Sequence, residues 1–275
     1  MILWLLKMTK AAFSRMHRHF TSLALPSALA LSMILLACTT VPDTGRSSFN
    51  FISAGQLNQM GLTQFEKIKS QKKLSHNPTQ LAALNRVAQR LRRVVPVQNA
   101  HWEFVLFDDS TPNAFALPGG KVGVNTGLFK VAHNDAQLAA VLGHELAHVV
   151  VGHSGERMST GIVGAAGVAV LGALLGQSSN SSGSAVSSAA GAVVGLGMLS
   201  FSRSQELEAD RLGALYMARG GYDPRESVQL WRNFAAEHSR QRGGGSPAFL
   251  NTHPLDATRI ENLAAYMPRA LMEYH

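Results

Sequence analysis

Residues 141–149 of the chain read Val141-Leu142-Gly143-His144-Glu145-Leu146-Ala147-His148-Val149. They contain the pattern His-Glu-x-x-His. Because an α-helix turns once every 3.6 residues, side chains four positions apart lie on one face. His144 and His148 can therefore direct two imidazole rings at a single ion, while Glu145 projects at the edge of that face. Two histidine ligands beside an unliganded carboxylate are typical of a catalytic zinc site with the glutamate as general base.

A third ligand is needed to separate this interpretation from a helix whose histidines are ordinary polar residues. A second helix is predicted to begin at Ser202, and it carries Glu206, Glu208 and Asp210. Glu206 can complete a set of two histidines and one glutamate and leave a fourth position open. Asp210 lies on the same face as Glu206 and can accept the second ring N–H of a ligating histidine. Glu208 is the alternative ligand, but it lies about 200° round the helix from Glu206.

Residues 1–37 are predicted to be a signal peptide of the lipoprotein type. Four basic residues and no acidic residue precede an apolar run from Leu23 to Ala37, which is the order found in secretory signals. The run is shorter than the about 20 apolar residues that a transmembrane helix needs. These residues are therefore expected to lie outside the folded domain.

Cys38 follows this run directly and is the only cysteine in the chain. A lone cysteine can be a buried apolar filler, but its position after a hydrophobic run resembles a bacterial lipobox, in which the cysteine is acylated. Residues 38–53 are then a lipidated N-terminus and tether. Thr39 rather than an aspartate follows the cysteine, and by resemblance to enterobacterial lipoproteins this implies the outer membrane, at its inner leaflet. We therefore predict a periplasmic protein that is anchored to the membrane through Cys38.

The charge balance argues against a nucleic-acid-binding role. The formal net charge is +8, and four of the positive charges belong to residues 1–37. The remaining excess is modest, and no lysine and arginine cluster lies on a recognised nucleic-acid-binding fold.

Residues 54–275 are predicted to form one domain of the α+β class, mainly helical with a small sheet. Hydrophobic periodicity predicts helices at about 54–71 and 77–95 and near the C-terminus at about 256–267. A strand is expected at 102–107, and a hairpin is expected over 113–124, where the turn carries glycines. Asn134 or Asp135 is expected to cap the His-Glu-x-x-His helix.

The hairpin precedes the His-Glu-x-x-His helix, so one of its strands can lie beside the metal. An edge strand in that place can pair with the backbone of an extended substrate. Asn113 to Ala116 is the candidate for this edge. The alternative is an ordinary hairpin that closes the core.

Residues 159–201 differ from the rest of the domain because they are rich in glycine and alanine around the polar tract 177–184. Neither apolar part is as long as a comfortable membrane span of about 20 residues. We interpret this segment as a helical insertion or lid that covers the cleft, or that contacts the membrane or an unfolded client.

Two further histidines are candidate ligands. His153 comes five residues after His148, which rotates it away from the metal face of a continuous helix, so a structural role is predicted. His253 follows the glycine-rich loop 240–247. Three roles remain open for it: donor to the oxyanion, fourth zinc ligand that holds the enzyme shut, or structural histidine.

With these residues in place, the chain resembles the HtpX-like zinc metallopeptidases, a gluzincin family, and within them the soluble bacterial lipoprotein branch. The resemblance extends from about Phe49 to the C-terminus. It rests on three motifs: Gly143–His148, Glu206–Asp210 after Ser202-Arg203, and Thr252-His253-Pro254 with Arg259. It implies a compact zincin-type domain, one Zn²⁺ per chain, and cleavage of misfolded or misassembled envelope proteins. Many relatives carry membrane spans where this chain has residues 159–201.

The predicted metal ligands are His144, His148 and Glu206, and the predicted catalytic residues are Glu145, Asp210 and His253. Glu145 is expected to take a proton from water activated by zinc and to deliver it to the leaving amine. Two other functions stay open. The protein is alternatively a chaperone-like outer-membrane assembly factor with latent proteolysis, or a prenyl-processing enzyme whose apolar runs span a membrane.

Overall fold

The computed structural model describes five parts of the chain, residues 38–41, 43–97, 100–174, 201–240 and 248–275. The elements in these parts are β1 Cys38–Thr40, β2 Ser47–Phe49, α2 Ala54–Gln71, α3 Pro78–Leu91, β3 Glu103–Phe107, β4 Ala114–Leu117, β5 Lys121–Asn125, the 3-10 helix η1 Thr126–Lys130, α4 Asp135–Val151, α5 His153–Leu174, α7 Arg203–Arg219, α8 Arg225–Arg240, α9 Ala248–Thr252 and α10 Ala257–Leu271. The described domain is mainly helical with a small sheet, so the predicted fold class is confirmed.

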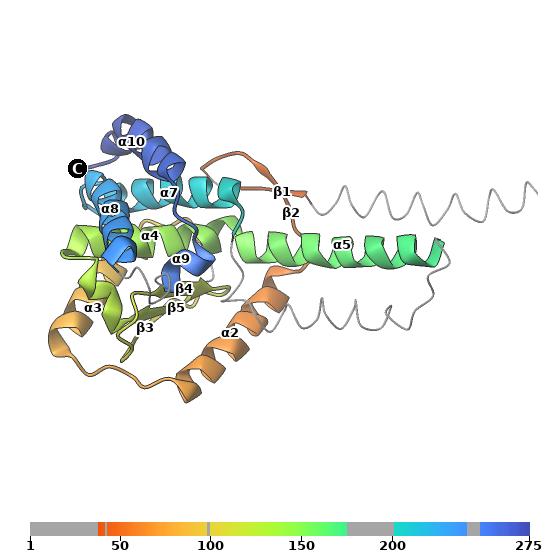
Figure 1. Cartoon of the computed structure of the whole chain (residues 1–275), viewed down its shortest axis with the longest axis horizontal. Helices are drawn as coiled ribbons and strands as arrows, with labels where there is room; N and C mark the ends of the chain where they lie inside the picture. The colour runs from red at the N-terminus through yellow and green to blue at the C-terminus, as the bar shows by residue number, and fades with distance from the viewer. Residues whose placement is uncertain (1–37, 42, 98–99, 175–200, 241–247) are drawn as a thin grey trace, which may run out of the picture.

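Helix α4 is the centre of the body, with the sheet on one side and α7 on the other (Figure 1). Its first turn is capped by Asn134, whose side chain accepts from the N–H of Gln137, and it ends at Gly152 in the left-handed conformation. Every residue from Gln137 to His148 is buried. A helix that is covered all round holds its side chains in fixed directions, which a metal site requires.

Helix α7 lies along α4 and brings the second ligand motif to it (Figure 1). Ser202 caps this helix, accepting from the N–H of Gln205, while the Gln205 side chain accepts from the N–H of Ser202. This capping box fixes where the helix begins. Glu206 and Asp210 therefore lie in the first two turns, on the side that faces α4, and both are buried.

The sheet has three strands in the order β3-β5-β4, with β3 parallel to β5 and β4 antiparallel to it. Gly119 and Gly120 form the turn between β4 and β5, and both have positive φ angles, which glycine adopts without strain. Strand β4 is an edge strand and packs against α4. The predicted hairpin and its edge position beside the His-Glu-x-x-His helix are confirmed.

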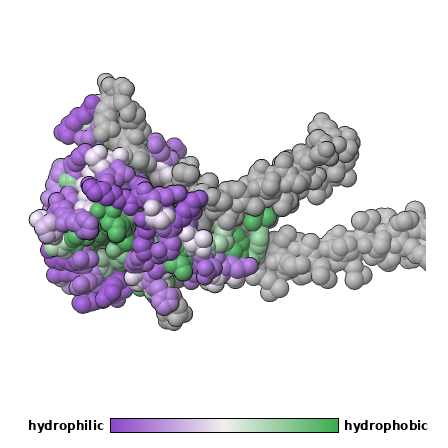
Figure 2. All heavy atoms as spheres, turned by 90° about the horizontal axis from the view of Figure 1, so that it is seen from below, coloured by the Kyte–Doolittle hydropathy of each residue, from purple (hydrophilic) through white to green (hydrophobic). Residues whose placement is uncertain are grey.

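The other helices cover this centre. Helix α3 packs on α4 and β3, α2 packs on the hairpin, and α8 and α10 cover α4 and α7 from the opposite side. Hydrophilic side chains cover most of the described surface on the face shown in Figure 2, with smaller hydrophobic patches between them. Two ends differ from the expected ones: α3 ends at Leu91 rather than near residue 95, and α10 continues past Pro268 to Leu271.

The segment expected to be a tether has structure of its own. β1 and β2 pair as an antiparallel ladder, and β2 contacts α5. Val41 and Ser48 are each no more than 3% exposed, and Arg46 pairs with Glu156 of α5 and Glu208 of α7, so residues 43–49 are held against the body. Lipidation of Cys38 stays a prediction, as does the signal peptide, because residues 1–37 lie outside the described residues.

Helix α5 is continuous from His153 to Leu174 and extends away from the body (Figure 1). The predicted insertion 159–201 therefore begins within this helix rather than at a break before it. Its residues 175–200 lie outside the described part, so its role as a lid stays a prediction. Within the described residues, no helix combines the length and the apolar character that crossing a membrane requires.

Candidate metal centre

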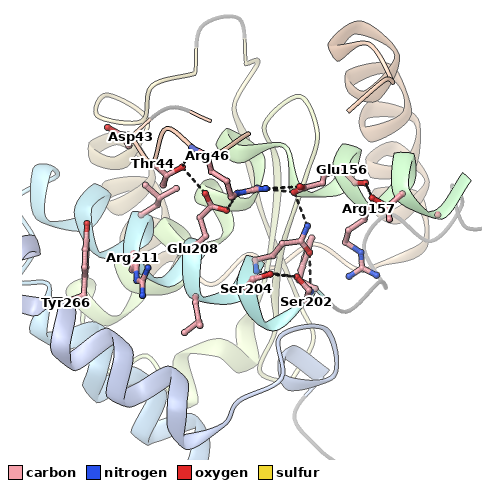
Figure 3. A pocket seen from close by; sticks show the side chains of 16 residues that line it. Asp43, Thr44, Arg46, Glu156, Arg157, Ser202, Ser204, Glu208, Arg211 and Tyr266 are labelled. Carbon is pink, nitrogen blue, oxygen red and sulfur yellow. Dashed lines mark hydrogen bonds and ion pairs between the residues drawn. The ribbon is translucent and has the colours of Figure 1, made fainter. Parts of the chain in front are cut away.

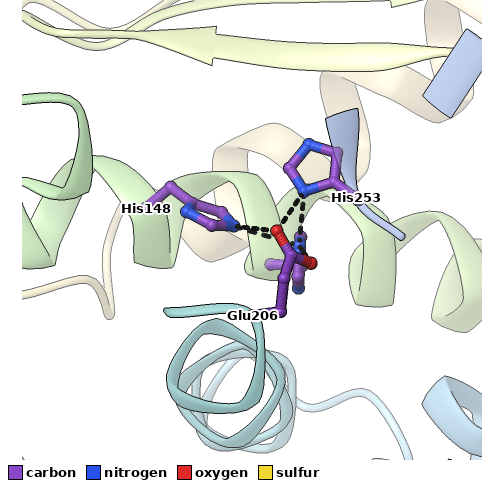
Figure 4. A group of neighbouring side chains, drawn as sticks. His148, Glu206 and His253 are labelled. Carbon is purple, nitrogen blue, oxygen red and sulfur yellow. Dashed lines mark hydrogen bonds and ion pairs between the residues drawn. The ribbon is translucent and has the colours of Figure 1, made fainter. Parts of the chain in front are cut away.

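Four buried side chains from three parts of the fold converge on one point (Figure 4). His144 and His148 come from α4, Glu206 from α7, and His253 from the residue after α9. One ligand atom from each of the four lies within 4.8 Å of the others. The Nε2 atoms of His144 and His148 are 3.1 Å apart, and Oε1 of Glu206 is 3.6 Å from Nε2 of His148.

The geometry of this cluster fits a tetrahedral zinc ion. Zinc bonds of about 2.0–2.1 Å place neighbouring ligand atoms about 3.3 Å apart at tetrahedral angles. The separations seen here lie close to that value, since Nε2 of His144 is 3.1 Å from His148, 3.2 Å from His253 and 3.4 Å from Glu206. Imidazole nitrogens with one carboxylate are also the donor set that zinc prefers.

Glu206, and not Glu208, is the carboxylate that joins the histidines. Its side chain is 1% exposed and lies between His148 and His253 (Figure 4). Burial raises the pKa of Glu206, but the neighbouring His253 and His144 outweigh this effect and hold the pKa well below its usual range. Glu206 is therefore an anion, which is the form that binds a cation.

Asp210 lies where the spacing of the second motif places it, behind His144. Its Oδ1 is 2.9 Å from Nδ1 of His144, so the histidine donates from Nδ1 and keeps Nε2 free for a metal. Burial lowers the pKa of His144, but its hydrogen bonds with Asp210 and Glu206 outweigh burial and raise the pKa to about 9.

Arg259 holds both carboxylates of α7 in place. It donates from Nε and Nη2 to the two oxygens of Asp210, at 2.9 and 2.7 Å, and its Nη1 is 2.7 Å from Oε2 of Glu206. All three side chains are 1% exposed. Arg259 was part of the sequence motif but had no predicted role, because the spacing gave no sign of a partner 49 residues away.

Glu145 lies between the ligands and the edge strand. Its Oε2 accepts a hydrogen bond from the backbone N–H of Ala116 in β4, at 2.9 Å, and its Oε1 is 3.2 Å from Nε2 of His253. Burial raises the pKa of Glu145, although His253 and His144 oppose the shift. A raised pKa suits a carboxylate that must both accept and return a proton.

His153 is a residue whose part in the site the spacing rule missed. Its Nδ1 lies 2.9 Å from Nδ1 of His148, and its Nε2 lies 3.2 Å from Oε2 of Glu208. The helix ends at Val151 and Gly152 is left-handed, so the rotation of a continuous helix does not apply to the next residue. His153 does not enter the ligand cluster, but it contacts the far side of a ligand ring.

Comparison with known proteins agrees with this geometry. Residues 78–267 match the model of Peptidase family M48, which is more than half of the chain. The chain belongs to peptidase family M48. The resemblance drawn from the sequence motifs is thereby confirmed. M48 peptidases use zinc, and the cluster of His144, His148, Glu206 and His253 is able to bind such an ion.

Relatives of this M48 chain occur in mitochondria and in bacteria. The mitochondrial metalloendopeptidase OMA1 of Schizosaccharomyces pombe is 33% identical over 234 residues, which cover 84% of this chain and 66% of that protein. OMA1 of Saccharomyces cerevisiae is 34% identical over 173 residues, 62% of this chain and 48% of that protein. The beta-barrel assembly-enhancing protease of Escherichia coli is 31% identical over 224 residues, 80% of this chain and 46% of that protein.

The chain thus spans from about half to two thirds of the length of these relatives. The relatives' names and the family assign the matched part of this M48 chain to the zinc metalloendopeptidases, whose substrates are polypeptides.

Proposed function

We propose that the protein is a zinc-dependent endopeptidase of the bacterial cell envelope that degrades misfolded or misassembled envelope proteins. The observation that carries this proposal is the buried cluster of His144, His148 and Glu206 with Glu145 between it and an edge strand. The relatives in Escherichia coli and Yersinia pestis named beta-barrel assembly-enhancing protease support the cellular setting.

In this proposal His144, His148 and Glu206 hold the zinc ion. When bound, zinc lowers the pKa of water and polarises a peptide carbonyl. Asp210 and Arg259 act behind these ligands: Asp210 fixes the tautomer of His144, and Arg259 fixes Asp210 and Glu206. The site therefore needs no rearrangement of these side chains to bind the ion.

Glu145 is the proposed general base and acid. The N–H of Ala116 fixes one of its oxygens, and the raised pKa keeps the other able to take a proton from water and give it to the leaving amine. The free edge of β4 is the part of the sheet that an extended substrate would pair with, because the other edge of this strand pairs with β5.

His253 is proposed as a fourth ligand that closes the site. Its Nδ1 is 2.9 Å from Oε1 of Glu206 and 3.2 Å from Nε2 of His144, so it lies inside the ligand cluster. A catalytic zinc site keeps one position open, whereas four protein ligands are typical of a closed site. His144, His148, Glu145, Glu206 and His253 are each no more than 2% exposed, which agrees with a closed state.

The proposed location is the periplasm, with the protein attached through acylated Cys38 to the inner leaflet of the outer membrane. Support comes from the sequence of residues 1–38 and from the bacterial relatives.

The test is zinc content together with casein cleavage by the full chain and by its Glu145→Gln variant. We expect one zinc ion per chain in both proteins and cleavage in the unchanged protein alone. Glutamine retains the shape and the contact with Ala116 but cannot take the proton. Absence of zinc from the unchanged protein would refute the ligand set, and equal cleavage by both proteins would refute the role of Glu145.

The burial of the whole site favours one alternative function, an assembly factor with latent proteolysis. In that case the Glu145→Gln variant would still support outer-membrane assembly in cells. If the endopeptidase function is the physiological one, the same variant fails to relieve accumulation of misassembled envelope proteins.

A further inference from the structure

Each of the two proposed histidine ligands of α4 has a hydrogen-bond partner at Nδ1, the ring nitrogen that does not face the metal site. Nδ1 of His144 faces Asp210, which Arg259 holds from within the core. Nδ1 of His148 faces His153 instead, at 2.9 Å. A ligating histidine depends on the acceptor at its other nitrogen for its tautomer and its orientation.

The support of His148 continues outward through two more side chains. His148 uses Nε2 toward the metal, so its Nδ1 carries the proton and donates to Nδ1 of His153. His153 then carries its own proton on Nε2 and donates to Oε2 of Glu208, at 3.2 Å. The same oxygen of Glu208 accepts from Nε of Arg46, at 2.8 Å. Each of these hydrogen bonds has one donor and one acceptor, so a single assignment of protons satisfies the whole series from His148 to Arg46.

Arg46 belongs to the segment 43–49 that lies against the body, and it is tied there twice (Figure 3). Besides Glu208, it donates from Nη1 and Nη2 to Glu156 of α5, at 2.8 and 3.0 Å. The other carboxylate oxygen of Glu208 accepts from Thr44, at 2.9 Å. Glu208 therefore receives hydrogen bonds from two residues of this segment.

The exposed fraction of the side chains increases along this hydrogen-bond series from His148 to Arg46. His148 and His153 are no more than 2% exposed, the Glu208 side chain is 10% exposed, and the Arg46 side chain is 36% exposed. Arg259, by contrast, is fully buried. The hydrogen bonds that begin at His148 thus extend to the protein surface, whereas those that begin at His144 end at the buried Arg259.

We propose that His153, Glu208 and Arg46 are positioning residues for the ligand His148, and that the seating of residues 43–49 on the body sets how tightly the site holds zinc. This inference rests on the ligand set of the proposed function. Because residues 43–49 follow Cys38, a pull on that segment would be transmitted to the metal ligand.

The test uses the full chain and measures the zinc dissociation constant by competition with a chelator. Arg46→Ala removes the last residue of the hydrogen-bond series His148–His153–Glu208–Arg46. Arg46 is partly exposed, so this substitution is not expected to unfold the protein. His153→Phe removes the acceptor of His148, and His153→Gln restores an acceptor and a donor. Arg225→Ala is the matched control, since it removes an arginine that pairs with Asp223 but leaves residues 43–49 and the hydrogen bonds that lead to His148 intact.

We expect zinc to bind about 10-fold more weakly to Arg46→Ala and up to about 100-fold more weakly to His153→Phe. The zinc affinities of His153→Gln and Arg225→Ala should remain close to that of the unchanged protein. The visible spectrum of the cobalt-substituted protein should change in His153→Phe and be retained in His153→Gln. A purely structural role of Arg46 would instead lower the melting temperature of the metal-free and the zinc-loaded forms equally.

If Arg46→Ala binds zinc as tightly as the unchanged protein, the inference is overturned, and it is overturned equally if Arg225→Ala weakens zinc binding as much as Arg46→Ala does. If the unchanged protein binds no zinc, the ligand set fails and the inference fails with it. If it binds zinc with the expected variant effects but cleaves no peptide, the endopeptidase proposal alone fails.

Discussion

Gly143 and Gly213 form a backbone contact between the two helices that carry the ligands. A β-carbon on Gly213 would lie 2.8 Å from the backbone nitrogen of His144, and one on Gly143 would lie 2.8 Å from the carbonyl oxygen of Gly213. A β-carbon does not approach the backbone of another helix to within 3.0 Å, so α4 and α7 can cross this closely only with glycine at both positions. This close crossing brings Glu206 within reach of His144 and His148.

Gly213→Ala should therefore separate the helices and weaken zinc binding. Overpacking of this kind costs about 1–3 kcal/mol in the free energy of unfolding, which urea denaturation measures. Gly161→Ala on α5 is the control, because a β-carbon there meets nothing within 4 Å, and it should leave stability unchanged or raise it by up to about 1 kcal/mol. Equal zinc affinity in Gly213→Ala and the unchanged protein would contradict the prediction.

Zinc binding should release close to one proton at pH 7.5. His144 has a pKa of about 9 without metal, so it is protonated at that pH, whereas zinc takes the neutral ring. The apparent zinc affinity should rise with pH and level off near pH 9. Calorimetric titration in two buffers of different ionisation enthalpy measures the proton count, and an identical heat in both buffers would show that no proton is released.

The raised pKa of His144 has the opposite effect on the stability of the metal-free protein, which should fall as the pH rises. The folded-state pKa of His144 is raised above the unfolded value of 6.5 to about 9, so its contribution to stability is fully present below pH 6.5. The contribution is lost as the pH rises through 9. The melting temperature of the metal-free form should therefore fall over this range, and zinc should abolish the fall.

The helices that carry the ligands could be predicted because their signals are local. Asn134 and Ser202 cap α4 and α7 through residues three positions away, and the four-residue ligand spacing lies within one helix. The roles of Arg259 and Arg46 could not be predicted. Their carboxylate partners lie 49 and 162 residues away, and no periodicity relates positions that meet only in the folded chain.

The short strands β1 and β2 escaped prediction for a related reason. Each has three residues, too few to show alternation, and β2 packs on α5, a contact that forms only in the folded chain. Helix α10 continues through Pro268 to Leu271, although a proline inside a helix removes one hydrogen bond and crowds the preceding turn; only the last four residues of the helix, 268–271, follow that turn.

Arg259→Met should destabilise the metal-free protein by about 3–5 kcal/mol, because it leaves Asp210 and Glu206 buried without their shared cation. Urea denaturation in the presence of a chelator measures the change. Arg225→Met is the control, since the Arg225 side chain is 66% exposed in its pair with Asp223, and the loss there should be at most about 1 kcal/mol. A loss for Arg259→Met no larger than that of the control would show that the buried carboxylates do not depend on this arginine.

His253→Ala should retain one zinc ion per chain and raise the cleavage of a quenched peptide. Three ligands remain for the metal, and removal of Nδ1 from the cluster opens the fourth position. If about one molecule in ten is open in the unchanged protein, the rise is about tenfold. Asn251→Ala, an exposed neighbour on α9, should change neither zinc content nor cleavage. A fall in cleavage with zinc retained would instead assign His253 to the oxyanion, and unchanged cleavage would leave it a structural residue.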